Sequence, residues 1–296
     1  MIVGEFDQLY ALYLQTFESY LNKYSERLNT EPSVLGDSMR YSLCNGGKRV
    51  RPVLMLAVAE MLGIEREDVL PYALALEMIH TYSLIHDDLP AMDNDDFRRG
   101  KPSNHKVFGE ANAILAGDAL LNQAFTICVN ECLKGENYVL AAKFLSECAG
   151  VNGMILGQSA DLYFSEPDRE VTKEDLFFVH ENKTGKLLAA PVLIPSILCN
   201  NRFYLRLEQF AKELGVLFQI TDDILDVTGD FNKLGKTIGK DEASGKLTYV
   251  KLYGLEGAMI RADECAQRAC TILESISDAN VTFLYDLVGY VRSRSR

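Results

Sequence analysis

Two aspartate-rich segments constrain the fold of this 296-residue chain most strongly, and they begin 135 residues apart. The first is Asp87-Asp88-Leu89-Pro90-Ala91-Met92-Asp93, the second is Asp222-Asp223-Ile224-Leu225-Asp226, and both lie in apolar stretches with helical spacing. Carboxylates on core-facing helices are costly unless cations neutralise them. Hard oxygen ligands suit Mg²⁺, which usually shares its coordination with water and substrate phosphates. The pattern predicts a site for metal ions and a diphosphate.

The spacing of apolar residues predicts an all-α fold. They recur at intervals of three and four through most of the chain, and strand-like alternation is scarce. One helix is predicted from about Tyr72 into the first acidic segment, and others at residues 6–27, 53–62, 111–133, 138–162, 173–182 and in two segments after 255. No linker divides the sequence, so residues 1–296 are expected to form one domain.

Composition excludes several classes of partner. The net charge of −12 and the pI near 4.9 argue against nucleic acids and anionic membranes, which select basic faces. The N-terminus does not resemble a signal peptide. The longest apolar run, residues 187–198, contains two prolines and is shorter than the roughly 20 residues of a membrane helix, so no membrane anchor is expected. The odd count of seven cysteines indicates reduced core residues, and we expect a cytoplasmic protein.

The second acidic segment fits a regular helix. Between residues 205 and 226 one helical stripe is apolar: Phe210, Leu214, Leu217, Phe218, Thr221 and Leu225. Another stripe is polar, and offsets of three, four and seven let its oxygens converge: Gln219, Asp222, Asp223 and Asp226. The alternative is an ordinary solvated face, because short acidic patterns are common. The lack of Lys or Arg on the same turns favours a ligand set.

The first acidic segment cannot be helical throughout. Pro90 lacks an amide donor and clashes with the preceding turn. Asp87 and Asp93 would not share a helical face at a separation of six, so a turn at Pro90-Ala91 is predicted if both bind metal. His80 lies two turns before Asp87, about 10 Å along the helix. A lone helical histidine is more often a packing residue, and only this position suggests a role.

Several basic groups could bind phosphate, with solvated surface charge as the alternative for each. Residues 46–52, Gly46-Gly47-Lys48-Arg49-Val50-Arg51-Pro52, place three cations after a flexible glycine pair. Arg98 and Arg99 offer forked donors that match phosphate oxygens. Further candidates are Lys183 and Thr184 in an interrupted helix, Lys236 and Lys246 in a Gly-rich region, and the basic tail at 292–296, which could close over a diphosphate.

These motifs, in this order, resemble the trans-type short-chain isoprenyl diphosphate synthases along nearly the whole chain. They are GGKRVRP at 46–52, HTYSLIHDDLPAMDNDDFRRGKPSNH at 80–105, ILAGDALL at 114–121, GQSADL at 157–162, KTG at 183–185, FQITDDILDVTGD at 218–230 and GK at 235–236. The resemblance implies an isoprenoid-synthase helical bundle around a deep central cavity, with the acidic segments facing each other across its mouth. It also implies a homodimer.

The resemblance implies a role for each candidate residue. Mg²⁺, expected as three ions with substrate bound, would be held by Asp87, Asp88, Asp93, Asp222, Asp223 and Asp226. The diphosphate of an allylic substrate would contact Arg98, Lys183, Thr184, Gln219, Lys236 and Lys246. Isopentenyl diphosphate would contact Lys48, Arg51, His80 and Arg99. The residues expected to act in catalysis are Asp87, Asp222, Arg98 and Lys183.

The implied reaction is ionisation, condensation and elimination. Metal and cationic side chains stabilise charge on the leaving diphosphate. The double bond of isopentenyl diphosphate attacks the allylic cation, and a proton passes to the departing pyrophosphate. An apolar cavity would shelter the cation from water, and no side-chain nucleophile is required.

Tyr82 and Ser83 are expected to set the product length, because in this family a large residue beneath the first acidic segment stops chain growth. Tyr82 lies five residues before Asp87, and Pro90-Ala91 widens the motif. This combination resembles bacterial-type farnesyl diphosphate synthases and predicts a C15 product, with C20 as the alternative. Tyr82 could also be a plain core aromatic.

Two other classes share parts of the pattern. A terpene cyclase would use the fold and Mg²⁺, but it would leave residues 46–52 and the second intact DDxxD without a role. A non-catalytic regulatory subunit of a heteromeric prenyltransferase typically has degraded acidic motifs, whereas both motifs are intact here.

Overall fold

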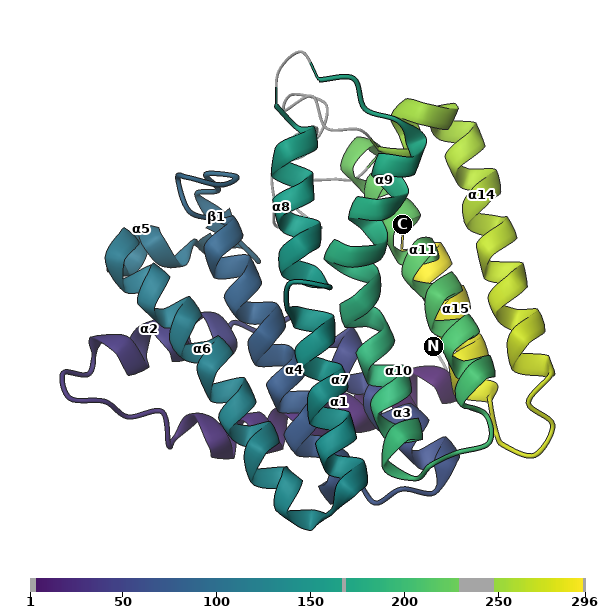
Figure 1. Ribbon diagram of the computed structural model, residues 1–296, viewed down its shortest axis with the longest axis horizontal. Helices are drawn as coiled ribbons and strands as arrows, with labels where there is room; N and C mark the ends of the chain where they lie inside the picture. The colour runs from purple at the N-terminus through teal and green to yellow at the C-terminus, as the bar shows by residue number, and fades with distance from the viewer. Residues whose placement is uncertain (1–3, 167–168, 229–247, 295–296) are drawn as a thin grey trace.

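Helices account for nearly all regular secondary structure in the computed structural model, which describes residues 4–166, 169–228 and 248–294 (Figure 1). The α-helices are α1 (Glu5–Ser25), α2 (Val34–Leu43), α3 (Val50–Leu62), α4 (Arg66–Asp87), α5 (Asn104–Phe108), α6 (Glu110–Glu131), α7 (Glu136–Ala149), α8 (Met154–Phe164), α9 (Lys173–His180), α10 (Lys186–Leu198), α11 (Tyr204–Thr228), α14 (Tyr249–Glu274) and α15 (Thr282–Ser293). Shorter elements are the 3-10 turn η1 (Cys132–Lys134), the π-helix η2 (Glu181–Gly185) and the paired strands β1 (Phe97–Arg98) and β2 (Lys101–Pro102). The all-α prediction is confirmed.

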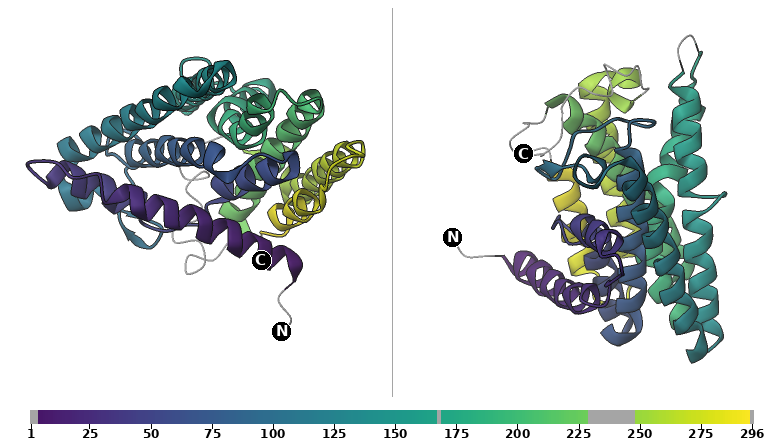
Figure 2. Two further views of the ribbon diagram at one scale, coloured as in Figure 1. Left: turned by 90° about the horizontal axis from the view of Figure 1, so that it is seen from below. Right: turned by 90° about the vertical axis from the view of Figure 1, so that its left-hand side faces the viewer.

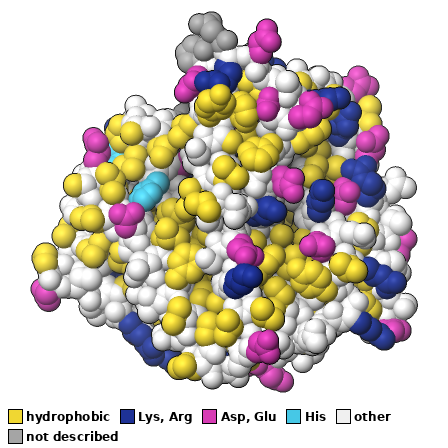
Figure 3. Space-filling view, in the orientation of Figure 1, with side chains coloured by type: hydrophobic (Ala, Val, Ile, Leu, Met, Phe, Trp, Pro, Cys, Tyr) yellow, Lys and Arg dark blue, Asp and Glu magenta, His cyan; other side chains and the backbone are white. Residues whose placement is uncertain are grey.

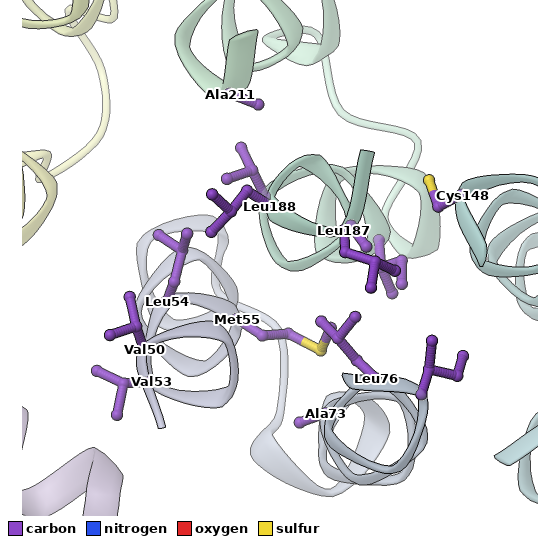
Figure 4. Packing of buried hydrophobic residues seen from close by; sticks show 14 of the residues in the cluster. Val50, Val53, Leu54, Met55, Ala73, Leu76, Cys148, Leu187, Leu188 and Ala211 are labelled. Atoms are coloured by element: carbon purple, nitrogen blue, oxygen red, sulfur yellow. The ribbon is translucent and has the colours of Figure 1, made fainter. Parts of the chain in front are cut away.

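Helices α3 and α4 form the middle of the bundle. Figure 2 shows them between α1 on one side and the layer that contains α6 and α10 on the other. Residues 50 to 59 of α3 are buried with the exception of Arg51, as expected for a helix that is apolar all round. Leu54 of α3 lies beside Leu188 of α10, and Leu76 of α4 lies between Met55 of α3 and Leu187 of α10 (Figure 4). Burial of each such leucine contributes about 2 kcal/mol.

The structure corrects three predicted helix boundaries. Residues 138–162, predicted as one helix, form α7 and α8. A Cβ on Gly153 would lie 2.1 Å from the carbonyl oxygen of Cys148, so the break between these helices requires glycine. The helix that leads to the first acidic segment begins at Arg66 rather than near residue 72. The first helix predicted after residue 255 begins earlier, at Tyr249, and bends at Gly254, whose φ is 69°.

Helices α6, α7 and α8 expose an apolar face. Leu115 and Val129 of α6 and Leu133 of the adjoining η1 are exposed on it, and Figure 3 shows hydrophobic side chains gathered over these helices. Two stretches are long and apolar enough to cross a membrane, Glu110–Lys134 and Glu136–Phe164. Core helices of soluble proteins also meet this criterion. Both pack into the bundle, α6 against α4 and α7 against α10. Their outer face is a surface on which another protein could pack.

Candidate active site

Both acidic segments reach one cavity of about 780 Å³, among α4, α6, α8, η2 and α11. The predicted site residues in its wall are Arg51, His80, Tyr82, Ser83, Asp87, Arg98, Arg99, Lys183, Thr184 and Asp222. The other predicted site residues that the structure describes do not line the cavity: Lys48, Asp88, Asp93, Gln219, Asp223 and Asp226. Lys236 and Lys246 lie outside the described residues. The fold therefore brings the distant acidic and basic segments to one place.

The first acidic segment folds back after α4 ends at Asp87. The Asp93 amide donates to the Asp87 carbonyl oxygen at 2.9 Å, and the Asp95 amide donates to the Asp88 carbonyl oxygen at 3.1 Å. Pro90 lies in this turn, where its missing amide breaks no helical hydrogen bond. The predicted turn is confirmed, and it returns Asp93 to the neighbourhood of Asp87.

Asp88 is buried and paired with Arg98. Nε of Arg98 donates to Oδ1 of Asp88 at 3.0 Å, a second guanidinium nitrogen donates to the same oxygen, and Asp95 lies 3.3 Å from this group. Burial raises the pKa of the Asp88 carboxyl, and Arg98 opposes this rise because it favours the charged form. Arg98, expected to contact a diphosphate, thus neutralises Asp88. Asp87 is the carboxylate of the pair that faces the cavity.

The second acidic segment lies within the continuous helix α11, as predicted. Asp222 lines the cavity, whereas Asp223 is only 3% exposed. Asp223 accepts hydrogen bonds from the Tyr249 amide at 2.8 Å and from Nε2 of Gln219 at 2.9 Å. Oγ1 of Thr184 donates to Oε1 of Gln219 at 2.9 Å. Gln219 therefore links η2 to the second acidic segment.

Two residues of α8 that sequence patterns did not single out complete the connection between the acidic segments. Nε2 of Gln158 donates to Oδ1 of Asp87 at 2.6 Å, and Nζ of Lys183 donates to Oδ2 of Asp161 at 2.7 Å. Gln158 and Asp161 share a helical face at a spacing of three. That spacing within GQSADL was the available signal. Asp161 orients Lys183, and Gln158 orients Asp87.

The π-helix η2 brings Lys183 close to both neighbouring helices. It interrupts the helix at the predicted point. A Cβ on Gly157 of α8 would lie 2.1 Å from the Lys183 amide nitrogen, and one on Gly215 of α11 would lie 3.2 Å from Cα of Gly185. Glycine at these positions permits the close approach. Single π-helical turns are often found at functional sites, in agreement with the position of this one in the cavity wall.

A basic wall completes the cavity. Nε of Arg51 is buried without a hydrogen-bond partner among the described residues, and burial lowers the pKa of this guanidinium. Burial, together with Arg51 and Arg99, holds the pKa of His80 well below its usual range, so the imidazole is neutral. Arg99 donates to the Gly46 carbonyl oxygen at 2.5 Å, and a Cβ on Gly47 would lie 2.9 Å from Cζ of Arg99. The glycine pair thus lets the two basic segments meet.

The three cations of residues 46–52 have different surroundings. Arg49 is 3% exposed and pairs with Glu18 at 2.8 Å and with Glu77 at 2.6 Å, so its role is structural. Lys48 is exposed, with its Nζ 5.9 Å from the centroid of the Tyr290 ring. Arg51 is the member of this group that lines the cavity.

The end of the described chain also reaches the site. α15 runs beside α11 (Figure 1), and Arg294, which follows it, places Nη2 3.5 Å from Oδ1 of Asp222. Cζ of Arg294 lies 4.4 Å from the centroid of the Phe218 ring. Within the residues that the structure describes, Nε and Nη1 of Arg294 are buried without hydrogen-bond partners. The basic tail therefore reaches the cavity at Arg294.

The carboxylates do not form a metal cage by themselves. Within residues 4–166, 169–228 and 248–294, no three His, Cys, Asp or Glu side chains are grouped so that they could hold a metal ion. Asp87 and Asp222 line the same cavity, and Asp226 is buried one turn further along α11. Mg²⁺ is usually held by one or two carboxylates together with waters and substrate phosphates. The residues therefore fit an ion that a diphosphate helps to bind.

Beyond the carboxylates the cavity wall is largely apolar. Its lining there includes Tyr82, Leu84, Leu121, Met154, Ile155 and Leu187. Tyr82 is 5% exposed, and burial raises its pKa to about 12. An apolar pocket with charged groups at one end suits a ligand with a hydrocarbon tail and an anionic head.

A helical bundle with an apolar cavity behind facing carboxylates and basic side chains is the arrangement expected of a prenyltransferase. The chain belongs to the polyprenyl synthetase family, whose family model matches residues 32–285. The resemblance carried by the motifs is thereby confirmed.

Relatives and solved structures agree with this assignment. The chain is 43% identical over 285 residues to a farnesyl diphosphate synthase of Bacillus subtilis, with 95% of each chain covered. It is 46% identical over 268 residues to a chloroplastic geranylgeranyl pyrophosphate synthase of Capsicum annuum, covering 89% of this chain and 72% of that protein. The structure matches a geranyltransferase from Helicobacter pylori complexed with magnesium and isoprenyl diphosphate, with a TM-score of 0.85, 34% identity and coverage of 98% and 97%.

Proposed function

We propose that this prenyltransferase joins isopentenyl diphosphate head to tail with dimethylallyl diphosphate and then with geranyl diphosphate, giving (2E,6E)-farnesyl diphosphate. The observation that carries the proposal is one cavity in which Asp87 and Asp222 face basic residues at one end and Tyr82 lies in the apolar part. The similarity to bacterial farnesyl diphosphate synthases supports the C15 product. Residues 1–296 are proposed to act as one polyprenyl synthase domain in the cytoplasm.

The six aspartates of the two segments are the proposed Mg²⁺ site, with three ions when substrate is bound. Bound Mg²⁺ would neutralise the charge that grows on a leaving diphosphate. Asp87 and Asp222 already face the cavity, whereas Asp88 becomes available when Arg98 turns from it to a diphosphate. This exchange would couple substrate binding to completion of the acidic site.

The basic residues are proposed to hold two diphosphates at separate places. The allylic diphosphate is assigned to Arg98, Lys183, Thr184, Gln219, Lys236 and Lys246. Isopentenyl diphosphate is assigned to Lys48, Arg51, His80 and Arg99. His80 is neutral, so it can donate a hydrogen bond without adding charge to a site already rich in guanidinium groups.

The proposed reaction breaks the bond between the allylic carbon and its diphosphate oxygen. Lys183 and Arg98 stabilise the negative charge on the leaving group. The apolar wall keeps water from the allylic cation until the double bond of isopentenyl diphosphate attacks it. The resulting cation loses a proton to the departing pyrophosphate, and Tyr82, with Ser83 beside it, stops growth at C15.

A homodimer is proposed because the apolar face of α6, α7 and α8 is large and exposed. A second copy that packs there would remove Leu115, Val129 and Leu133 from water. Sedimentation velocity should show a dimer for the protein and a monomer for Leu133→Glu. A monomeric wild-type protein at micromolar concentration would contradict this part of the proposal.

The function is tested with purified protein, Mg²⁺, dimethylallyl diphosphate and labelled isopentenyl diphosphate, followed by phosphatase treatment and sizing of the alcohols. A C15 alcohol is expected. Mainly C20 would keep the mechanism and replace the product by geranylgeranyl diphosphate, a second candidate favoured by the similarity to the Capsicum annuum protein. Absence of condensation with either dimethylallyl or geranyl diphosphate would overturn the proposal.

A further inference from the structure

His86 lies in the cavity wall between α4 and α6, and the proposed reaction gives it no role. It follows Tyr82 by one turn of α4, and the two rings meet edge to face with centroids 5.6 Å apart and planes at 82°. Both residues line the cavity. Because a helical turn rises about 5.4 Å, His86 lies that much closer to the acidic mouth than Tyr82 does.

Helix α6 holds the imidazole from the other side. Nε2 of His86 donates a hydrogen bond to the carbonyl oxygen of Ile114 at 3.1 Å and lies 3.9 Å from Oδ1 of Asp118. Gly117 lies directly against the ring, since a Cβ there would be 2.2 Å from Nε2 of His86. Glycine is a poor helix former, and this one is buried within α6. The missing side chain is what makes room for the imidazole.

Tyr82 depends on its neighbours for its orientation. Its hydroxyl is buried and has no hydrogen-bond partner in the part of the chain that the structure describes. Packing therefore determines where the ring points, and the His86 ring is one of the surfaces that it packs against. A change at His86 is transmitted to Tyr82 through this contact.

We propose that His86, seated on Gly117, is a second determinant of product length. The imidazole forms a side wall of the tail pocket and holds Tyr82 in position as the floor. This inference rests on the proposed function and refines it, because it assigns the C15 limit to two rings rather than to Tyr82 alone. Displacing the imidazole into the cavity narrows the pocket above Tyr82 and favours C10. Removing the imidazole frees Tyr82 to turn aside and favours C20.

The test compares the products of Gly117→Ala, His86→Ala and the double variant with those of the wild type. Gly117→Ala should raise the ratio of C10 to C15 about tenfold, and His86→Ala should raise the ratio of C20 to C15 about tenfold, the size of effect that one group in an apolar pocket produces. The double variant should behave like His86→Ala, because without the ring there is no clash.

Two controls separate this effect from others. Gly289→Ala is the matched glycine control, since a Cβ at Gly289 in α15 would meet nothing within 4 Å, and its products should equal those of the wild type. His86→Gln keeps a donor for the Ile114 carbonyl and removes the ring, so it should also favour C20. Alanine is the better helix former, so a lower Tm in Gly117→Ala, restored in the double variant, reports the clash directly.

The outcomes are distinguishable from failure of the proposed function. If the wild type performs no condensation, the proposed function fails first. If the wild type makes C15 and the Gly117 and His86 variants keep its product ratios, this inference is wrong. It is also wrong if the double variant still favours C10, because the shortening then does not involve the imidazole.

Discussion

The two acidic segments are almost alike in sequence but differ in structure. The second lies on the uninterrupted helix α11, whereas the first spans the end of α4 and a turn closed between Asp93 and Asp87. In each Asp-Asp pair the first residue, Asp87 or Asp222, faces the cavity and the second, Asp88 or Asp223, is buried. Position in the fold therefore separates the cavity-facing carboxylate from its supporting neighbour, although the residue type is the same.

The buried neighbours are stabilised in different ways. Asp88 pairs with the charge of Arg98, and among the described residues Asp223 accepts hydrogen bonds from the Tyr249 amide and the side chain of Gln219. An ion pair leaves an unpaired charge when one partner is removed, whereas a neutral donor can keep an amide as its acceptor. The two segments should therefore respond differently to the same substitution.

The largest effect is expected at the cavity-facing carboxylates, where the two segments should behave alike. Asp87→Asn and Asp222→Asn should each lower kcat about 1000-fold, because each removes charge from the place where a diphosphate leaves. Steady-state kinetics at saturating Mg²⁺ measure this. A variant that retains more than about one tenth of the activity would show that its segment is not part of the ion site.

Substitutions of the two buried aspartates, Asp88 and Asp223, should differ in their effect on stability. Asp88→Asn should lower the free energy of unfolding by about 3 kcal/mol, because it removes the closer of the two carboxylates that pair with Arg98 and leaves Asp95 at 3.3 Å. Counting the hydrogen bonds among the described residues, Asp223→Asn should cost about 1 kcal/mol, since the amide oxygen still accepts the bond from the Tyr249 amide. Urea unfolding measures both. Asp88→Asn combined with Arg98→Gln should recover part of the loss, and equal costs for the two single variants would contradict the comparison.

Gln158 and Gln219, one beside each acidic segment, should differ in their effect on the Mg²⁺ requirement. Gln158→Leu should raise the Mg²⁺ concentration for half-maximal activity by about tenfold or more, because Asp87 loses the donor that orients it. Gln219→Leu should have a smaller effect on this requirement, since the Tyr249 amide still holds Asp223. Activity titrated with Mg²⁺ at fixed substrate provides the measurement. The reverse order would show that Gln219, rather than Gln158, is the more important positioning residue.

The smallest expected effect involves one partly buried histidine near each segment. Burial lowers the pKa of His180 to about 3, and burial beside Arg51 and Arg99 holds that of His80 well below 6.5. Below about pH 6.5 the unfolded chain binds protons that the folded chain does not, so the free energy of unfolding falls by about 1 kcal/mol per pH unit for each histidine. Urea unfolding at pH 7.0 and 5.5 tests this. His180→Phe should remove the contribution of that histidine to the change in the free energy of unfolding with pH. A flat profile would mean that these histidines become protonated in the fold.

Local periodicity predicted α11 well. The apolar stripe that includes Phe210, Leu214 and Leu217 is buried, and the polar stripe lies toward the site. It predicted the chain around α7 and α8 less well, because the close backbone approach that requires Gly153 is not visible in the pattern. The turn after Asp87 was predictable because the proline effect is local.

The basic residues show where prediction from sequence ended. Arg49 and Arg51 are two positions apart and chemically identical, yet Arg49 is paired with Glu18 and Glu77, and Arg51 lines the cavity. Their roles depend on carboxylates from α1 and α4, which no spacing within residues 46–52 reveals.

The sequence by itself determined that the chain is helical and that it carries two carboxylate clusters with basic groups, because periodicity and residue chemistry are local properties. Only the tertiary structure decided which aspartate of each pair faces the cavity, that Gln158 and Asp161 position the site, and that His86 rests on Gly117. Those arrangements depend on distances between helices, and packing of the whole core determines such distances.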